Sequence, residues 1–112
     1  MSVSPFLHAE SSSDSPSTQS VTTIRVGCEL DRSSEAEVLR ELLPRVQSGA
    51  VVLDLSRVDW MDAAGIAALI TLYCQATQFG HSFSIISPSA HVLELLHIVG
   101  LDKILIGSPQ AA

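Results

Sequence analysis

Basic residues are scarce in this chain, and they are not clustered. Only 6 Lys and Arg stand against 12 Asp and Glu among 112 residues, which gives a formal net charge of −6. Binding to a nucleic-acid backbone requires grouped Lys and Arg side chains, so we predict no nucleic-acid partner. An acidic surface instead favours a protein partner that carries a basic patch.

Long apolar runs and paired cysteines are also missing. No stretch is long enough to span a bilayer, and the N-terminus lacks the basic and apolar regions of a signal peptide. Cys28 and Cys74 stand alone and match no Cys-x-x-Cys or Cys/His pattern. Isolated cysteines usually pack as small reduced hydrophobes in the core. We therefore expect a cytoplasmic protein without direct membrane insertion.

The sequence has no arrangement typical of an enzyme or a phosphate-binding loop. No signature places a base beside a nucleophile, and Gly65 belongs to no Gly-rich phosphate cradle. His91, Glu94 and His97 follow three-residue spacing. A solvated helix face explains this spacing better than a metal site, which needs further ligands. We predict no catalytic residue.

Three carboxylates near the middle of the chain are the other candidate ligand set. Asp54, Asp59 and Asp62 could together hold Mg²⁺, which prefers oxygen ligands. A strand end, a turn and a helix cap account for them more simply. We predict neither a metal nor a cofactor.

The apolar pattern defines one domain with two tails. Nearly half of the residues, 46%, are apolar, which is enough to build a core. Residues 1–20 are Ser-rich and lack periodicity, so we predict a disordered N-terminal tail. The domain is expected to span residues 21–107, and residues 108–112 to form a short C-terminal tail.

Strands and helices are predicted to alternate along the domain. The expected strands are 21–30, 50–55, 83–86 and 103–106. The expected helices are 34–48, 62–79 and 91–99. Short links between alternating elements indicate an α/β architecture.

Three local signals refine this pattern. Ser34 and Glu37 have the spacing of a capping box. Pro44 removes a helical hydrogen bond, so we expect a kink or an early helix end there. The near-continuous apolar run 50–55 is typical of a strand covered on both faces.

The segment Met61–Ala67 is the most informative in the chain. It follows the apolar run Val51–Leu55 and begins a helical pattern, with Asp62 as the expected N-cap. A helix start carries unpaired N–H groups and a partial positive charge, and can receive an anion or an acidic side chain. The first helical residues here have no hydroxyl, thiol or imidazole.

Small side chains make this helix start low and flat. Such a surface either lets another backbone approach closely or packs against the domain's own strands. Trp60 and Met61 beside it favour an interface, where aromatic residues and Met are enriched. The small residues are Ala63, Ala64, Gly65, Ala67 and Ala68.

Several segments in this order resemble the STAS domain, the fold of bacterial anti-sigma factor antagonists. The likeness covers roughly residues 21–106 and implies a mixed sheet of four to five strands with helices packed against it. The segments that carry it are Gly27–Asp31, Val51–Ser56, Trp60–Ile66, Ser87–Pro88 and Val99–Leu101.

The resemblance also implies a function. In that family, the Ser or Thr after the signature Asp is phosphorylated by a partner kinase that often doubles as the anti-sigma factor. The phosphoacceptor-equivalent position here is Ala63, which cannot accept a phosphoryl group. The chain is therefore expected to be a non-catalytic regulatory module that binds an anti-sigma factor or serine/threonine kinase-like partner without that switch. The residues expected to bind the partner are Asp31, Trp60, Met61, Asp62, Ala63, Ala64, Gly65 and Ile66.

Two alternatives stay open. Single STAS domains also serve as accessory subunits of ABC-type phospholipid transporters, which would replace the anti-sigma factor by a transporter ATPase. The exposed edge of a small sheet could pair with a second copy, so a homodimer is also possible.

Overall fold

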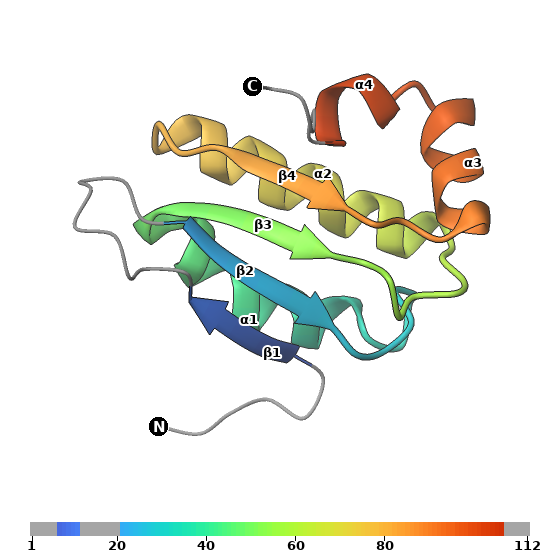
Figure 1. The fold of residues 1–112 in the computed structure, drawn as a ribbon, viewed down its shortest axis with the longest axis horizontal. Coiled ribbons are helices and arrows are strands. Elements are labelled where there is room, and N and C mark those ends of the chain that lie inside the picture. The colour runs from blue at the N-terminus through green and yellow to red at the C-terminus, as the bar shows by residue number, and fades with distance from the viewer. Residues whose placement is uncertain (1–6, 12–20, 107–112) are drawn as a thin grey trace.

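A mixed four-stranded sheet with helices on one face forms the body of the molecule. The computed structural model describes residues 7–11 and 21–106 (Figure 1). The strands are β1 (Leu7–Ser11), β2 (Val21–Val26), β3 (Ala50–Asp54) and β4 (Phe83–Ile86), in the spatial order β1-β2-β3-β4. The helices are α1 (Glu35–Ser48), α2 (Ala63–Gln78), α3 (Ala90–Ile98) and α4 (Asp102–Leu105).

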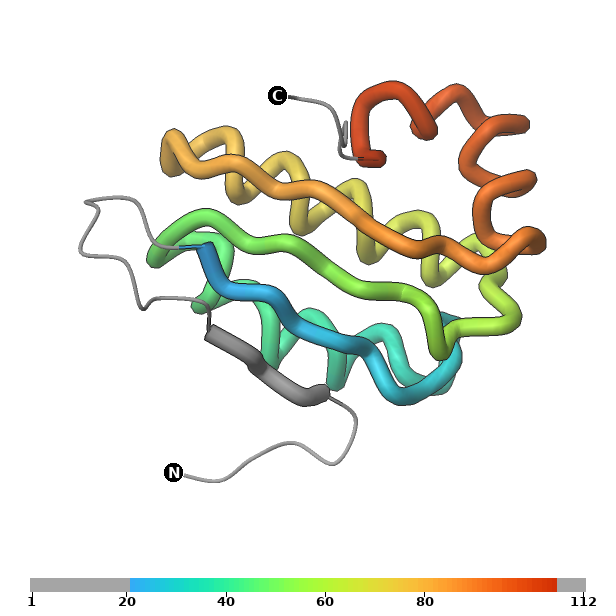
Figure 2. Tube along the Cα trace, in the orientation of Figure 1, coloured from blue at the N-terminus to red at the C-terminus, as the bar shows by residue number. Residues whose placement is uncertain are grey.

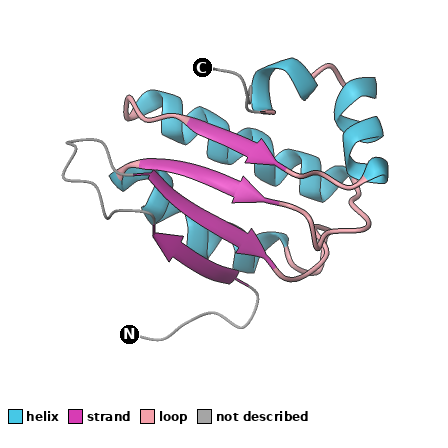
Figure 3. Cartoon of the chain, in the orientation of Figure 1, coloured by secondary structure: helices cyan, strands magenta, loops and turns pink. Residues whose placement is uncertain are grey.

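The connections explain why α1 and α2 share one face of the sheet. β2, β3 and β4 are parallel neighbours, and β1 pairs antiparallel with β2. The crossovers through α1 and α2 step in the same direction across the sheet. Since such crossovers are right-handed, both helices lie on the same side (Figure 3). The predicted α/β fold with a mixed sheet is confirmed.

β3 is not covered on both faces by the residues that the structure describes. Val51 and Leu53 are buried beneath the helices, whereas Val52 and Asp54 are half-buried on the other face. There Arg25 of β2 pairs with Asp54 at 3.8 Å. The prediction of a doubly covered strand is wrong because both crossover helices lie on the same side.

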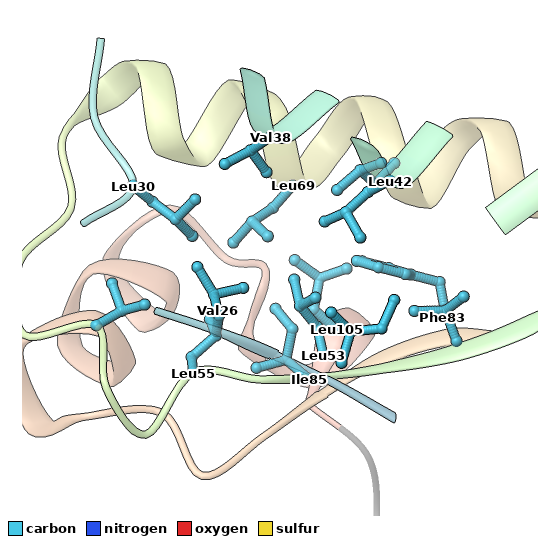
Figure 4. Packing of buried hydrophobic residues seen from close by; sticks show 14 of the residues in the cluster. Val26, Leu30, Val38, Leu42, Leu53, Leu55, Leu69, Phe83, Ile85 and Leu105 are labelled. Carbon is cyan, nitrogen blue, oxygen red and sulfur yellow. The ribbon is translucent and has the colours of Figure 1, made fainter. Parts of the chain in front are cut away.

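The core lies between the sheet and the helices. Strand residues such as Leu53 and Ile85 meet Leu42 of α1 and Leu69 of α2, and Leu105 of α4 packs into the same cluster (Figure 4). All five are buried to within 1% exposure. This packing fixes where α2 begins relative to β3.

The start of α1 is stabilised differently from the prediction. Ser34 makes no side-chain cap, and its hydroxyl donates to the Glu29 carbonyl. The Asp31 carboxylate caps the turn instead, because its Oδ1 accepts from the Ser33 and Ser34 N–H groups at 2.9 and 3.1 Å. The predicted capping box between Ser34 and Glu37 is therefore wrong.

The end of α1 also differs. The helix continues through the exposed Pro44 to Ser48, so the predicted early end is wrong. The Ser48 hydroxyl donates to the Pro44 carbonyl at 2.8 Å and supports this last turn.

Both ends of the domain differ from the sequence pattern. β1 lies within the segment 1–20, so the prediction of disorder is wrong for Leu7–Ser11. The rest of that tail and residues 108–112 lie outside the described residues. The predicted strand 103–106 is wrong as well, because α4 occupies most of it, as the coiled trace shows (Figure 2). In this segment only Ile106 bridges to Ile85, at the edge of β4.

The two cysteines are free but differ in environment. Cys28 is half-buried against the core, and burial raises the pKa of its thiol. Cys74 on α2 is exposed, so the prediction that both thiols pack in the core is wrong for this residue. Neither cysteine is close to the start of α2 in sequence.

Candidate functional site

The start of α2 is fixed by one carboxylate that serves two segments. Asp62 Oδ1 accepts from the Ala64 and Gly65 N–H groups at 2.9 and 3.1 Å, which confirms Asp62 as the N-cap. Its Oδ2 accepts from the Arg32 N–H at 3.2 Å. Asp62 thus ties the loop before α1 to the first turn of α2, and both of its oxygens are already bonded.

Asp31 shapes the loop on the other side of that link. Its Oδ1 accepts from the Ser33 hydroxyl at 2.7 Å and from two backbone N–H groups of its own turn. The Ser33 hydroxyl, followed by these backbone donors, lowers the pKa of the Asp31 carboxyl below its ordinary 3.8. Asp31 is therefore a turn-forming residue beside the site, and this carboxylate is committed to local bonds.

Gly65 lets α2 approach the backbone before α1. A Cβ at this position would lie 2.6 Å from Met61 Cγ and 2.9 Å from Leu30 Cβ, and closer still to the Leu30 carbonyl. Leu30 and Met61 also form an isolated parallel bridge. The tight fit sets the depth of α2 against the core.

Some small residues of α2 pack inside the domain, and others are exposed where a partner could contact them. Gly65 and Ala68 face inward and are buried, whereas Ala63 and Ala67 are exposed. Met61 is only 2% exposed. Gly65 and Met61 lie buried beneath this surface, and their part in partner binding stays a prediction.

Trp60 stands on the outside of the site. It is 48% exposed, and its backbone N–H donates to Glu29 Oε1 at 2.7 Å. Its ring is stacked on that of His91 from α3, with ring centroids 6.4 Å apart and planes 6° apart. A ring nitrogen of His91 lies 3.5 Å from the Met61 carbonyl oxygen. The start of α3 therefore belongs to the same surface as the start of α2.

An apolar groove of about 270 Å³ runs between α2 and α3. Ala63 and Ile66 form one wall, and Leu95 and Val99 form the other. Val99 was not predicted as a site residue, and it is 49% exposed. The signal that could have indicated it is the apolar stripe of the third helix, which continues past the last buried position, Leu96. The residues that line the groove are Met61, Asp62, Ala63, Ile66, Leu95 and Val99.

The candidate ligand sets do not converge. Asp54 pairs with Arg25 and accepts from the Ser56 N–H at 2.8 Å, while Asp62 caps α2. His97 bonds Asp102 at 2.9 Å at the turn between α3 and α4. Within residues 7–11 and 21–106, no group of three or more acidic, His or Cys side chains is placed to hold a metal ion.

With this geometry in view, comparison with known families gives the class of the protein. The family model described as "Mlab, STAS domain" matches residues 14–107, which is most of the chain. The chain therefore belongs to the STAS domain family. None of the described helices has the length and apolar character needed to cross a membrane.

Solved structures share the fold at low sequence identity. The Thermotoga maritima protein TM1081, described as a candidate anti-sigma factor antagonist, is 20% identical with a TM-score of 0.71, over 77% of this chain and 76% of that one. The unphosphorylated anti-sigma factor antagonist SpoIIAA of Bacillus is 14% identical with a TM-score of 0.70, over 91% and 87%. The murine anion transporter Slc26a9 is 19% identical with a TM-score of 0.66, over 80% of this chain but 15% of the transporter.

Proposed function

We propose that this chain is a non-catalytic regulatory module that docks a protein partner through the start of α2. The observation that carries this proposal is Ala63, an exposed and chemically inert residue at the phosphoacceptor-equivalent position. The adjacent Asp62 has both oxygens bonded within the domain. The surface offers shape and apolar contact, and it has no group at Ala63 that phosphorylation could switch.

The partner that the fold relatives favour is an anti-sigma factor or a serine/threonine kinase-like protein. Two structural neighbours are described as anti-sigma factor antagonists, one of them in its unphosphorylated form. A phosphoryl group would add a charge of about −1.5 to −2 at the helix start. Because Ala63 cannot be phosphorylated, this position permanently lacks the phosphoryl charge, so docking is constitutive and the module acts in the cytoplasm.

A second candidate function is that of an accessory subunit of an ABC-type phospholipid transporter. Two observations favour it: the matching family model carries the description "Mlab", and a structural neighbour is part of an anion transporter. In this case the docking surface binds the transporter ATPase. Affinity capture from the host cells separates the two candidates, because one predicts a soluble kinase-like or anti-sigma protein and the other a transporter ATPase.

The site is tested by Ala63→Glu, which puts a charge into the docking surface. Binding of the recovered partner, measured by calorimetry, should weaken by about 1–3 kcal/mol, the range for an uncompensated buried polar group. Ala36→Glu is the matched control, because Ala36 is likewise exposed in the first turn of its helix, α1. Equal affinity of both variants and the unchanged protein would reject the α2 start as the docking site.

A further inference from the structure

The two flanks of α2 differ in chemistry. On the flank that faces α1, Gln75 accepts a hydrogen bond from Gln47 at 2.9 Å. The opposite flank carries apolar residues at three- and four-residue spacing, from Ala63 at the helix start through Ile66 and Ile70 to Tyr73. Ile70 is 41% exposed, and Ile66 and Tyr73 are half-buried. This flank is continuous with the groove between α2 and α3, because Ala63 and Ile66 also line the groove.

The segment that builds both walls of the groove carries charges of one sign, whereas Arg32, whose backbone N–H bonds Asp62, belongs to the loop before α1. Residues 58–102, which include α2, β4 and α3, contain no Lys or Arg. None of the groove-lining side chains is basic, and Asp62 is among them. The acidic residues of this segment are Asp59, Asp62, Glu94 and Asp102. A binding partner that is complementary to this surface combines apolar side chains with Lys or Arg.

The walls of the groove are helices, and this favours a helical occupant. The nearest strand, β4, has its outer edge partly occupied by the bridge between Ile85 and Ile106. None of the described residues that line the groove belongs to β1, β2, β3 or β4, so the groove itself presents no strand edge to extend. The flank from Ala63 to Tyr73 spans about 15 Å at 1.5 Å per residue, which matches about three turns of a partner helix. A helix packs its side-chain ridges into such a groove.

We propose that the groove between α2 and α3 receives an amphipathic helix of the partner, with its aliphatic stripe on Ile66, Ile70 and Val99 and with Lys or Arg along its edges. This inference rests on the proposed docking function and specifies how the partner is held. A second copy of the chain is disfavoured as the occupant, because a two-fold contact would bring the same acidic groups face to face.

Photo-crosslinking from matched positions tests this proposal in the full-length chain. A benzoylphenylalanine side chain replaces Val99 in one protein, Ile104 in a second and Ala63 in a third. Val99 and Ile104 are 49% and 50% exposed, but only Val99 lines the groove. After irradiation in an extract of the host cells, mass spectrometry identifies the cross-linked peptide. Val99 should cross-link to a partner segment with helical apolar spacing and flanking Lys or Arg, and Ile104 should not.

Each other result has a defined meaning. Cross-links from Ala63 but not from Val99 would retain the proposed function and overturn the helix in the groove. A Val99 cross-link to a second copy, or to an acidic or non-helical segment, would also overturn it. Absence of cross-links from both positions would reject the groove and the docking site together.

A binding measurement with the identified segment completes the test. A synthetic peptide of that segment should bind Val99→Asp about tenfold more weakly than the unchanged protein, and Ile104→Asp within about twofold of it. Affinity should also fall as salt rises, because the acidic surface and basic edges are screened. Circular dichroism checks that both variants are folded. Equal affinity for the two variants, or affinity independent of salt, would contradict the proposal.

Discussion

Two hollows formed by the described residues lie at opposite ends of the parallel strands, and the larger of these two is not the better docking site. A hollow of about 430 Å³ lies where β2 and β3 begin, lined by Thr22, Pro44, Arg45, Ser48, Gly49 and Ala50. The smaller groove at the start of α2 is mostly apolar. Water solvates the polar lining well, whereas covering the apolar groove removes hydrophobic surface from water. Chemistry and not volume distinguishes the two ends.

The two ends also differ in how tightly their backbones are packed. Gly65 at the α2 start has no room for a side-chain carbon, because Leu30 and Met61 surround it. At Gly49, beside the polar hollow, a Cβ would meet nothing within 4 Å, and the φ of 178° is extended backbone that any residue adopts. The backbone at the start of α2 is therefore tightly packed and has no room for a larger side chain, whereas the backbone at Gly49 has room for one.

The largest effect is expected from Gly65→Ala. Overpacking costs about 1–3 kcal/mol, and the gain of about 1 kcal/mol from replacing a helical Gly by Ala offsets only part of it. The contact with the Leu30 carbonyl involves a backbone atom and cannot be relieved by a side-chain rotation, so the overpacking cost should lie at the upper end of that range, about 3 kcal/mol, and the net loss should be about 2 kcal/mol. Urea unfolding measures it.

Gly49→Ala is the matched substitution at the other end. It should change the free energy of unfolding by less than about 0.5 kcal/mol, as for surface substitutions without a special role. If the two variants lost equal stability, the contrast between a fitted end and a tolerant end would be wrong.

A smaller effect is expected from removing the cap of α2. Asp62→Ala loses bonds to the Ala64, Gly65 and Arg32 N–H groups, and should cost about 1–2 kcal/mol. Hydrogen exchange should accelerate in the first turn of α2 and in the loop around Arg32. Amides at the start of β3, beside the polar hollow, should exchange as before.

Ser89→Ala is the comparison within the groove's other wall. Ser89 caps α3 through one bond to the Val92 N–H at 3.3 Å, so its loss should cost less than that of Asp62. A larger loss for Ser89→Ala would show that α3, and not the link between Asp62 and Arg32, holds the groove in shape.

The sequence allowed the α2 start to be located but not its surface to be divided. Asp62 as the cap follows from residue type and position, and the structure has it there. Which of the small residues face inward does not follow, because Ala63 and Ala68 have the same side chain and only tertiary packing separates them. Leu30, which leaves no room for a Cβ at position 65, comes from a segment far away in the chain.

The structure of the segment after α3 was harder to predict from the sequence for a related reason. The segment 103–106 is apolar and short, and at that length a strand and a helical turn cannot be told apart by periodicity. The N–H groups of Ile104 and Leu105 donate to the Leu101 carbonyl, which selects the helix. Whether this segment forms a helical turn or a strand therefore depends on the tertiary packing that buries Leu105 in the core.

The smallest effect is expected from acid. The lowered pKa of Asp31 means that the folded state releases its proton more readily than the unfolded chain. Its contribution to stability is complete above the ordinary value of 3.8 and is lost as the pH falls through the lowered pKa. The midpoint of thermal unfolding should therefore fall with pH below about 4 in part because of Asp31.

Ser33→Ala removes the strongest cause of that shift, the hydroxyl bond to Asp31, and leaves the charge in place. The acid-induced drop in the unfolding midpoint should become shallower in this variant, and shallower still in Asp31→Asn. Because Arg32 lies between this turn and Asp62, both variants should also raise hydrogen exchange at the α2 start. An unchanged pH profile in Asp31→Asn would mean that the turn contributes nothing to the stability of the site end, and that Asp62 alone holds it.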